Sequence, residues 1–230
     1  MVPVSLRQEV LEQLHEAHMG IEASLRKARE SVFWPGLTAQ LKDKIQRCEV
    51  CQSLGMCQPK EPLKSHDIPS RPWEVLGVDL FEFGGGNFLV TVDYFSGFWE
   101  LDRLSDTSSA TVILQLRRQF ARYGVSLKSV SDNGPRFSCS AFRQFAQKWS
   151  FTHVTSSPHF PASNGKAESA VKTAKSLIRK AQQDGLDPWV AILEYRNTMT
   201  EGMTSSPMQW LMGRRGQTQV PIKPDLLKPA

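Results

Sequence analysis

The sequence has few cysteines, no long apolar run and no internal repeat. Three of its four cysteines lie between positions 48 and 57, and this clustering favours a metal site over the disulfide framework of a secreted protein. No apolar stretch approaches the length that spans a bilayer. The N-terminus, MVPVSLRQEV, also lacks the pattern of a secretory signal. A membrane protein or a secreted disulfide-rich protein is therefore not expected.

The composition is that of an ordinary globular protein with a basic bias. Hydrophobic residues make up 40% of the 230 positions, which is enough for a core, and this length favours one or two domains. The formal net charge is +5, which mildly favours a polyanionic partner. Charge alone does not identify that partner.

The chain is expected to form two domains joined by a linker. Helical spacing of apolar residues over 1–58 predicts a small all-α domain, and the prolines spaced through 59–71 indicate an extended linker. The pattern then changes, and residues 72–213 are predicted to form an α/β domain. A basic, proline-containing tail at 214–230 is expected to be irregular.

Within the α/β domain, strands and helices are expected in a definite order. Period-two patterns predict strands over 74–81, 87–94, 98–104, 126–131 and 151–155. Helices are predicted over 108–123, over 139–149, after Gly165 and from Asp187-Pro188. The order of three strands, helix, strand, helix, strand and helix predicts a ribonuclease H-like core, with a mixed five-stranded sheet and helices.

Two histidines and two cysteines in the helical domain have the spacing of metal ligands. His15 and His18 are three positions apart, and 29 residues separate them from the pair Cys48 and Cys51. Four nitrogen and sulfur ligands are the closed set that structural zinc prefers, and a metal suits a domain with a small core. The alternative is two surface histidines beside a free or redox-active CxxC, with Cys57 as a spare thiol.

Three carboxylates in the α/β domain suit divalent cations. Asp79 lies inside an apolar strand and Asp132 opens the turn SDNG, while Glu168, with 35 residues between it and Asp132, lies near the start of a helix. A carboxylate in an apolar strand is costly unless it is paired or binds a metal. In a ribonuclease H-like fold the three groups meet, and together they suit two divalent ions acting on a phosphodiester.

Several motifs carry a resemblance to a known family. They are FWPGL (33–37), VDLFEF (78–83), VDYFSGFWE (92–100), SDNGPRF (131–137), SSPHFPASNGKAES (156–169) and EYRNT (194–198). With the His-His-Cys-Cys set, these resemble the integrases of gypsy-class long-terminal-repeat retrotransposons and of retroviruses. The resemblance implies that Asp79, Asp132 and Glu168 are a catalytic triad for two Mg²⁺ or Mn²⁺ ions. It also implies that the His/Cys set holds one structural Zn²⁺.

The helix after Gly165 carries a basic stripe beside this triad. Glu168, Lys172, Lys175 and Arg179 share one helical face, next to an apolar stripe of Ala167, Val171, Ala174 and Ile178 that should face the core. By resemblance, the basic stripe contacts the phosphates of element-end DNA. Lys166 and Asn164 are further candidates for DNA contact, Asn164 in a polar loop expected to close on substrate. The alternatives are a solvated face and a plain connector.

The activity that the resemblance implies is DNA integration. Such an enzyme trims the 3′ ends of retroelement DNA and joins them to target DNA by phosphodiester transfer, without a covalent protein intermediate. The expected partners are element ends, target DNA and further copies of the chain, with no membrane. The expected site of action is the nucleus, because the substrate is there, after synthesis in the cytoplasm.

Two other functions remain open from the sequence. Family members usually continue into a small β-barrel, whereas this sequence stops at Ala230, so we expect a polyprotein fragment or a truncated copy. A truncated copy could be a domesticated DNA-binding protein with weak or no activity. A ribonuclease H-like nuclease without transfer is the third interpretation, which the predicted zinc domain and basic stripe disfavour.

Overall fold

The computed structural model describes residues 2–54, 69–156, 165–200 and 202–229. Most of the predicted linker, Cys57 and Asn164 therefore lie outside the described residues. The chain divides into two compact units: 1–61 together with 174–230, and 62–173. The domain boundaries drawn from the sequence stay predictions.

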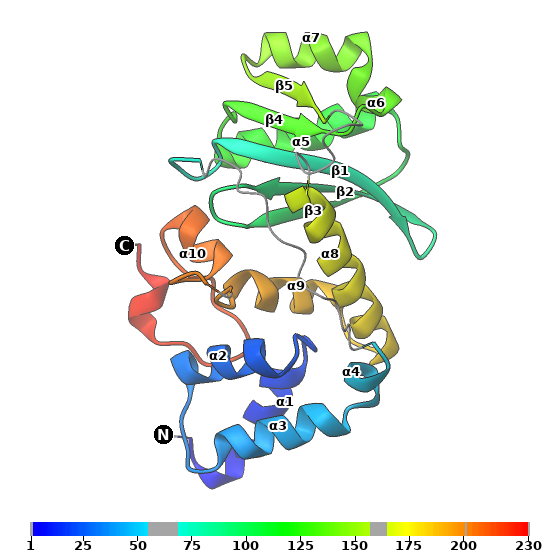
Figure 1. The fold of residues 1–230 in the computed structure, drawn as a ribbon. Helices are drawn as coiled ribbons and strands as arrows, with labels where there is room; N and C mark the ends of the chain where they lie inside the picture. Colours follow the sequence, from blue (N-terminus) through cyan, green and yellow to red (C-terminus); the bar gives the residue numbers. More distant parts are fainter. Residues whose placement is uncertain (1, 55–68, 157–164, 201, 230) are drawn as a thin grey trace. The chain divides into compact units, whose positions relative to one another are not determined.

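The second unit is built on a mixed five-stranded sheet (Figure 1). Its strands are β1 (Val75–Phe83), β2 (Gly86–Asp93), β3 (Trp99–Leu104), β4 (Lys128–Ser131) and β5 (Thr152–Thr155). The order across the sheet is β3-β2-β1-β4-β5. The first three strands are antiparallel neighbours, whereas β4 pairs in parallel with both β1 and β5. This topology confirms the predicted fold class.

Local sequence explains the connections in this sheet. Gly84 and Gly85 have φ of 56° and 70° in the β1–β2 turn, a backbone region that glycine enters without a Cβ penalty. The connection to β4 is α5 (Ser109–Tyr123), whose cap, Ser108, accepts a hydrogen bond from the Thr111 N–H. The short helix α6 (Pro135–Ser138) and α7 (Ser140–Lys148) connect β4 to β5.

An aromatic cluster holds these helices against the sheet. Phe120 of α5 packs on Phe145 of α7, and both rings contact Phe151 at the start of β5. Phe142 lies edge-on to Phe145. All four of these residues are buried, and edge-to-face pairs add to the free energy gained from burial. The cluster therefore packs α5 and α7 together next to β5, while β4 is buried and β5 itself stays largely exposed.

The first unit is helical. Its N-terminal part comprises η1 (Val4–Leu6), α1 (Arg7–His15), α2 (Ile21–Ser31), α3 (Leu37–Arg47) and α4 (Glu49–Ser53). Leu14, Trp34 and Leu41 are almost fully buried at the centre of its core. The predicted all-α character of this region is confirmed.

Helices from the C-terminal part of the chain complete this unit. They are α8 (Gly165–Gln183), which runs across the division between units, α9 (Pro188–Asn197), α10 (Pro207–Met212) and η3 (Pro224–Leu227). Ala167, Ala174 and Ile178 of α8 are buried, as the predicted apolar stripe requires. Asp187 caps α9 by accepting from the Trp189 N–H, also as predicted.

Buried ion pairs connect α2 to the segment after α8. Lys27 of α2 pairs with Glu194 of α9, and both side chains are almost completely buried. Arg215 forms a two-pronged contact with Glu30 at the end of α2, and it also donates to Gln209 of α10. Removing one member of such a buried pair is strongly destabilising, because the other charge is left without a partner. These contacts specify how α2 packs within this unit.

No helix among the described residues is both long and apolar enough to cross a membrane.

Candidate functional site

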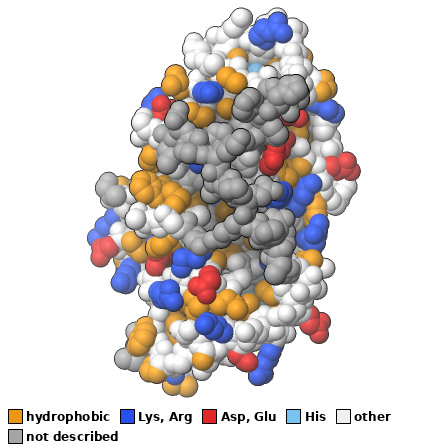
Figure 2. All heavy atoms as spheres, in the orientation of Figure 1, with side chains coloured by type: hydrophobic (Ala, Val, Ile, Leu, Met, Phe, Trp, Pro, Cys, Tyr) orange, Lys and Arg blue, Asp and Glu red, His pale blue; other side chains and the backbone are white. Residues whose placement is uncertain are grey.

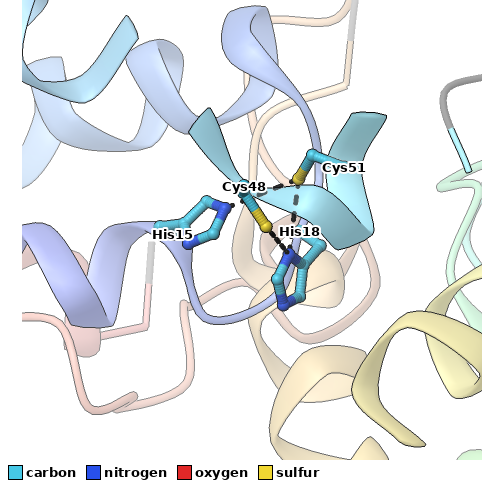
Figure 3. Close-up of side chains that lie close together, drawn as sticks. All are labelled: His15, His18, Cys48 and Cys51. Carbon is cyan, nitrogen blue, oxygen red and sulfur yellow. Dashed lines mark hydrogen bonds between the residues drawn. The ribbon is translucent and has the colours of Figure 1, made fainter. Parts of the chain in front are cut away.

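The predicted His/Cys set forms one compact cluster. His15 is the last residue of α1, and His18 lies in the turn that follows. Cys48 directly precedes α4, and Cys51 lies within that helix. One nitrogen or sulfur atom from each residue lies within 4.8 Å of the others. Figure 3 shows the two rings and the two sulfurs pointing toward one another. The structure thus brings together four ligand atoms separated by up to 36 positions in sequence.

The distances within the cluster fit a tetrahedral zinc donor set. His18 Nδ1 lies 3.3 Å from Cys51 Sγ and 3.5 Å from Cys48 Sγ, and His15 Nε2 lies 3.5 Å from Cys51 Sγ. Burial, followed by the charge of Cys48, raises the pKa of the Cys51 thiol to about 12. A bound cation would have to displace that proton. Burial lowers the pKa of His15 to about 4, which keeps its imidazole neutral and able to act as a ligand.

His18 has a second partner that sequence reasoning missed. Its Nε2 lies 2.6 Å from Asp184 Oδ2, on the residue directly after α8. The Lys180 side chain, one turn earlier, donates to the His18 carbonyl at 2.9 Å. These residues follow His18 by more than 160 positions and belong to no motif, so no sequence pattern could have indicated either contact.

Asp79 and Asp132 lie at matching positions on adjacent parallel strands. The β1–β4 ladder ends at the pair Gly77 and Val130, and each aspartate is two residues further along its own chain. Neighbouring strands are about 4.8 Å apart, so Asp79 on β1 and Asp132 just after β4 start from corresponding backbone positions. The Asp132 side chain accepts from the Gly134 N–H at 3.1 Å. A Cβ at Gly134 would lie only 3.0 Å from Asp132 Oδ1, so glycine suits this turn.

Glu168 lies in the first turn of α8, a helix that packs against β1. A Cβ at Gly77 would lie 3.2 Å from the Ala167 Cβ and 2.7 Å from the Tyr94 ring. The helix therefore approaches β1 closely, two residues before Asp79. Burial, with a smaller contribution from the nearby charge of Glu168, raises the pKa of Tyr94 to about 12. Glu168 therefore lies near Tyr94. The residue before it on α8, Ala167, packs against β1 at Gly77.

The three carboxylates are not gathered as tightly as the zinc-type ligands. Among the described residues, the His/Cys set is the group of possible metal ligands whose ligand atoms all lie within 4.8 Å of one another. Asp132 and Glu168 are exposed and Asp79 is half-buried, so all three are open to solvent. Carboxylate oxygens are the ligands that Mg²⁺ and Mn²⁺ prefer, and cations would offset the mutual repulsion of the three charges. The donor set therefore fits these ions.

Replacing Gly77 with alanine is expected to disturb the approach of α8 to β1. The new Cβ would force the Tyr94 ring or Ala167 to move, so we expect a loss of about 1–3 kcal/mol in unfolding free energy. Denaturant unfolding measures this loss. Gly165→Ala is the matched control, because none of the described residues beyond its chain neighbours places an atom within 4 Å of the added Cβ. Equal stability of the two variants would contradict the close approach.

The basic residues on α8 are only partly exposed. Lys172 and Arg179 are exposed and Lys175 is half-buried. Lys166 is engaged locally, because its Nζ donates to the Tyr94 carbonyl at 2.5 Å and lies 5.3 Å from the centre of the Tyr94 ring. Contact of these residues with DNA stays a prediction.

Charge is mixed over the face drawn in Figure 2. Lys and Arg side chains are interspersed with Asp and Glu side chains there, and they do not merge into one basic field outside the grey atoms. Outside the grey atoms, that face therefore carries charges of both signs. Any attraction of nucleic acid on it would come from local groups such as the α8 stripe.

Two protein-family models match the chain. The integrase zinc binding domain matches residues 2–55, and the integrase core domain matches residues 69–161. The first match contains the His/Cys cluster, and the second contains Asp79 and Asp132. Glu168 lies beyond the second match.

Curated relatives are considerably longer than this chain. An uncharacterized protein of Caenorhabditis elegans, K02A2.6, is 32% identical over 230 residues, covering 96% of this chain and 18% of the relative. The Tf2-3 transposon polyprotein of Schizosaccharomyces pombe is 28% identical over 198 residues, covering 80% of this chain and 15% of the polyprotein. The chain thus spans less than a fifth of the length of these relatives.

Solved structures support the fold. The chain resembles the integrase of the simian T-cell lymphotropic virus intasome complex with a TM-score of 0.59 and 21% identity, over 94% of this chain and 78% of that one. The catalytic core of bovine immunodeficiency virus integrase (BIV) gives a TM-score of 0.51 and 23% identity, over 60% and 93%. The gypsy class within the family stays a prediction. With both predicted domains matched, the chain belongs to the integrases of retrotransposons and retroviruses.

Proposed function

We propose that this chain is a metal-dependent polynucleotidyl transferase that trims retroelement DNA ends and joins them to target DNA. The observation that carries this proposal is the placement of three carboxylates. Asp79 and Asp132 follow the same rung of the β1–β4 ladder, and α8 packs against β1 at Gly77 with Glu168 in its first turn. A phosphodiester is also an anion, so three carboxylates at one exposed edge would repel it. They suit such a substrate only if cations bind together with it.

Each residue of the triad has a distinct positioning role in this proposal. Asp79, on the central strand β1, would be the ligand common to both cations, and Asp132 and Glu168 would supply the other protein carboxylates. When bound, divalent cations would supply Lewis-acid activation of the attacking hydroxyl and would neutralise charge on the scissile phosphate. Solvent exposure of Asp132 and Glu168 leaves that edge accessible to a DNA backbone. Lys172 and the rest of the α8 stripe bind flanking phosphates.

The His/Cys cluster has a structural role in this proposal. It holds one Zn²⁺ through all four ligands, a closed set that leaves no position for catalysis. The proposed partners are element-end DNA, target DNA and further copies of the chain, because integrase structures include an intasome and a trimeric core. The proposed site of action is the nucleus, where the target DNA is.

The test is phosphodiester transfer on a branched DNA that mimics the product of strand joining. Such a substrate needs recognition of neither a free element end nor a separate target. The zinc-loaded chain is expected to resolve it when Mg²⁺ or Mn²⁺ is titrated in, and to be inactive without either ion. Salt-sensitive DNA binding with no turnover at any concentration of either ion would contradict the proposal and favour the domesticated DNA-binding alternative.

A further inference from the structure

The His18 ring is held between the cysteine sulfurs and a carboxylate from a distant part of the chain. Its Nδ1 is directed at the two sulfurs, at 3.3 and 3.5 Å, while its Nε2 lies 2.6 Å from Asp184 Oδ2. A neutral imidazole carries one proton, so a ring that donates from Nε2 has its lone pair on Nδ1. The Asp184 contact thereby selects the tautomer that a metal requires.

The backbone of His18 also depends on the end of α8. Its φ of 47° is in the left-handed region, which is unfavourable for a non-glycine residue. Lys180 donates to the His18 carbonyl at 2.9 Å, and the His18 N–H donates to the His15 carbonyl at 2.8 Å. One turn at the end of α8 therefore fixes both the main chain and the ring of this ligand.

The burial of the His18 ring limits its possible hydrogen-bond partners. The His18 side chain is 1% exposed, whereas Asp184 is 43% exposed. The ring can therefore reach few other hydrogen-bond acceptors. Asp184 and His18 belong to the same compact unit, so the contact lies within one packed structure.

We propose that Asp184 is a positioning residue of the zinc site, whose carboxylate fixes the His18 ring with Nδ1 facing Cys48 and Cys51. This inference rests on the proposed zinc site. A carboxylate that accepts from the outer nitrogen of a ligating histidine orients the ring and raises its basicity, and its loss typically weakens metal affinity 10–100-fold. Zinc affinity and the packing of the end of α8 on the His15–His18 turn should then be coupled.

The test is zinc affinity, measured by competition with a metallochromic chelator on the full chain. Asp184→Ala is expected to bind Zn²⁺ about 10–100-fold more weakly than the unmodified protein. Asp184→Asn retains an acceptor for Nε2–H but not the charge, so its loss should be smaller. Asp225→Ala is the matched control, because it removes an exposed carboxylate of the same unit that pairs with Lys228, away from the His/Cys cluster. Its affinity should not change.

Cobalt(II) substitution provides a second measurement, independent of affinity and of DNA transfer. At saturating Co²⁺ the absorption spectrum should be the same in Asp184→Asn and in the unmodified protein, because the four ligands are unchanged. An altered spectrum would make Asp184 a direct ligand and overturn the proposed role. Unchanged affinity in both Asp184 variants would also overturn it. If the unmodified chain bound no zinc, the proposed zinc site itself would fail.

Discussion

Replacing Asp132 with asparagine is expected to abolish phosphodiester transfer while leaving the fold intact. The variant removes one of three charges that face the proposed cations, and an amide is a poorer ligand than a carboxylate. A loss on the order of 10³-fold, about 4 kcal/mol of transition-state stabilisation, is expected on the branched substrate. The substituted side chain can still accept the Gly134 N–H through its amide oxygen, so the turn should persist.

Two comparisons keep this result from being ambiguous. Asp43→Asn removes an exposed carboxylate on α3 that pairs only with Arg47 among the described ion pairs, and it should keep full activity. DNA binding by the Asp132→Asn variant should be unchanged or slightly stronger, because a negative charge near the phosphates has been removed. Transfer by Asp132→Asn at the unmodified rate would show that the carboxylates at this edge of the sheet are not the catalytic group.

The sheet and its connections could be predicted because the signals are local. The alternation of apolar residues marks the strands, and side-chain caps at Ser108 and Asp187 mark the starts of α5 and α9. The juxtaposition of Asp79 with Asp132 required one further step. The predicted topology places their strands side by side, and the ladder register then sets the two residues at equal height.

Most of the missed features depend on contacts between distant residues. Asp184 lies outside every motif and becomes informative only when it meets His18. Arg215 lies in a tail expected to be irregular, yet it is buried against Glu30 and Gln209. The short helix α10 has only six residues, too few for a periodic pattern to be distinguished from chance. Pairings of this kind are set by tertiary packing, which composition and periodicity do not specify.

Replacing Cys51 with serine is expected to unfold the zinc-binding helices while the sheet persists. Zinc contributes roughly 10–16 kcal/mol in small zinc-dependent domains, which exceeds the stability that a core of this size provides. The Cys51 Sγ lies within 3.5 Å of both histidine rings, so its loss affects the centre of the donor set. Hydrogen exchange should show lost protection in α1 and α3, with β1 and β4 still protected.

A matched cysteine separates loss of the metal from loss of a thiol. Cys139, in the other unit, accepts the Phe142 N–H as the cap of α7, and serine is a good residue for that role. Cys139→Ser should therefore keep full protection in all the described helices and bind zinc normally. If Cys51→Ser instead left α1 and α3 protected, the apolar core around Leu14 and Leu41 would be sufficient to keep these helices folded, and zinc would not be essential to their structure.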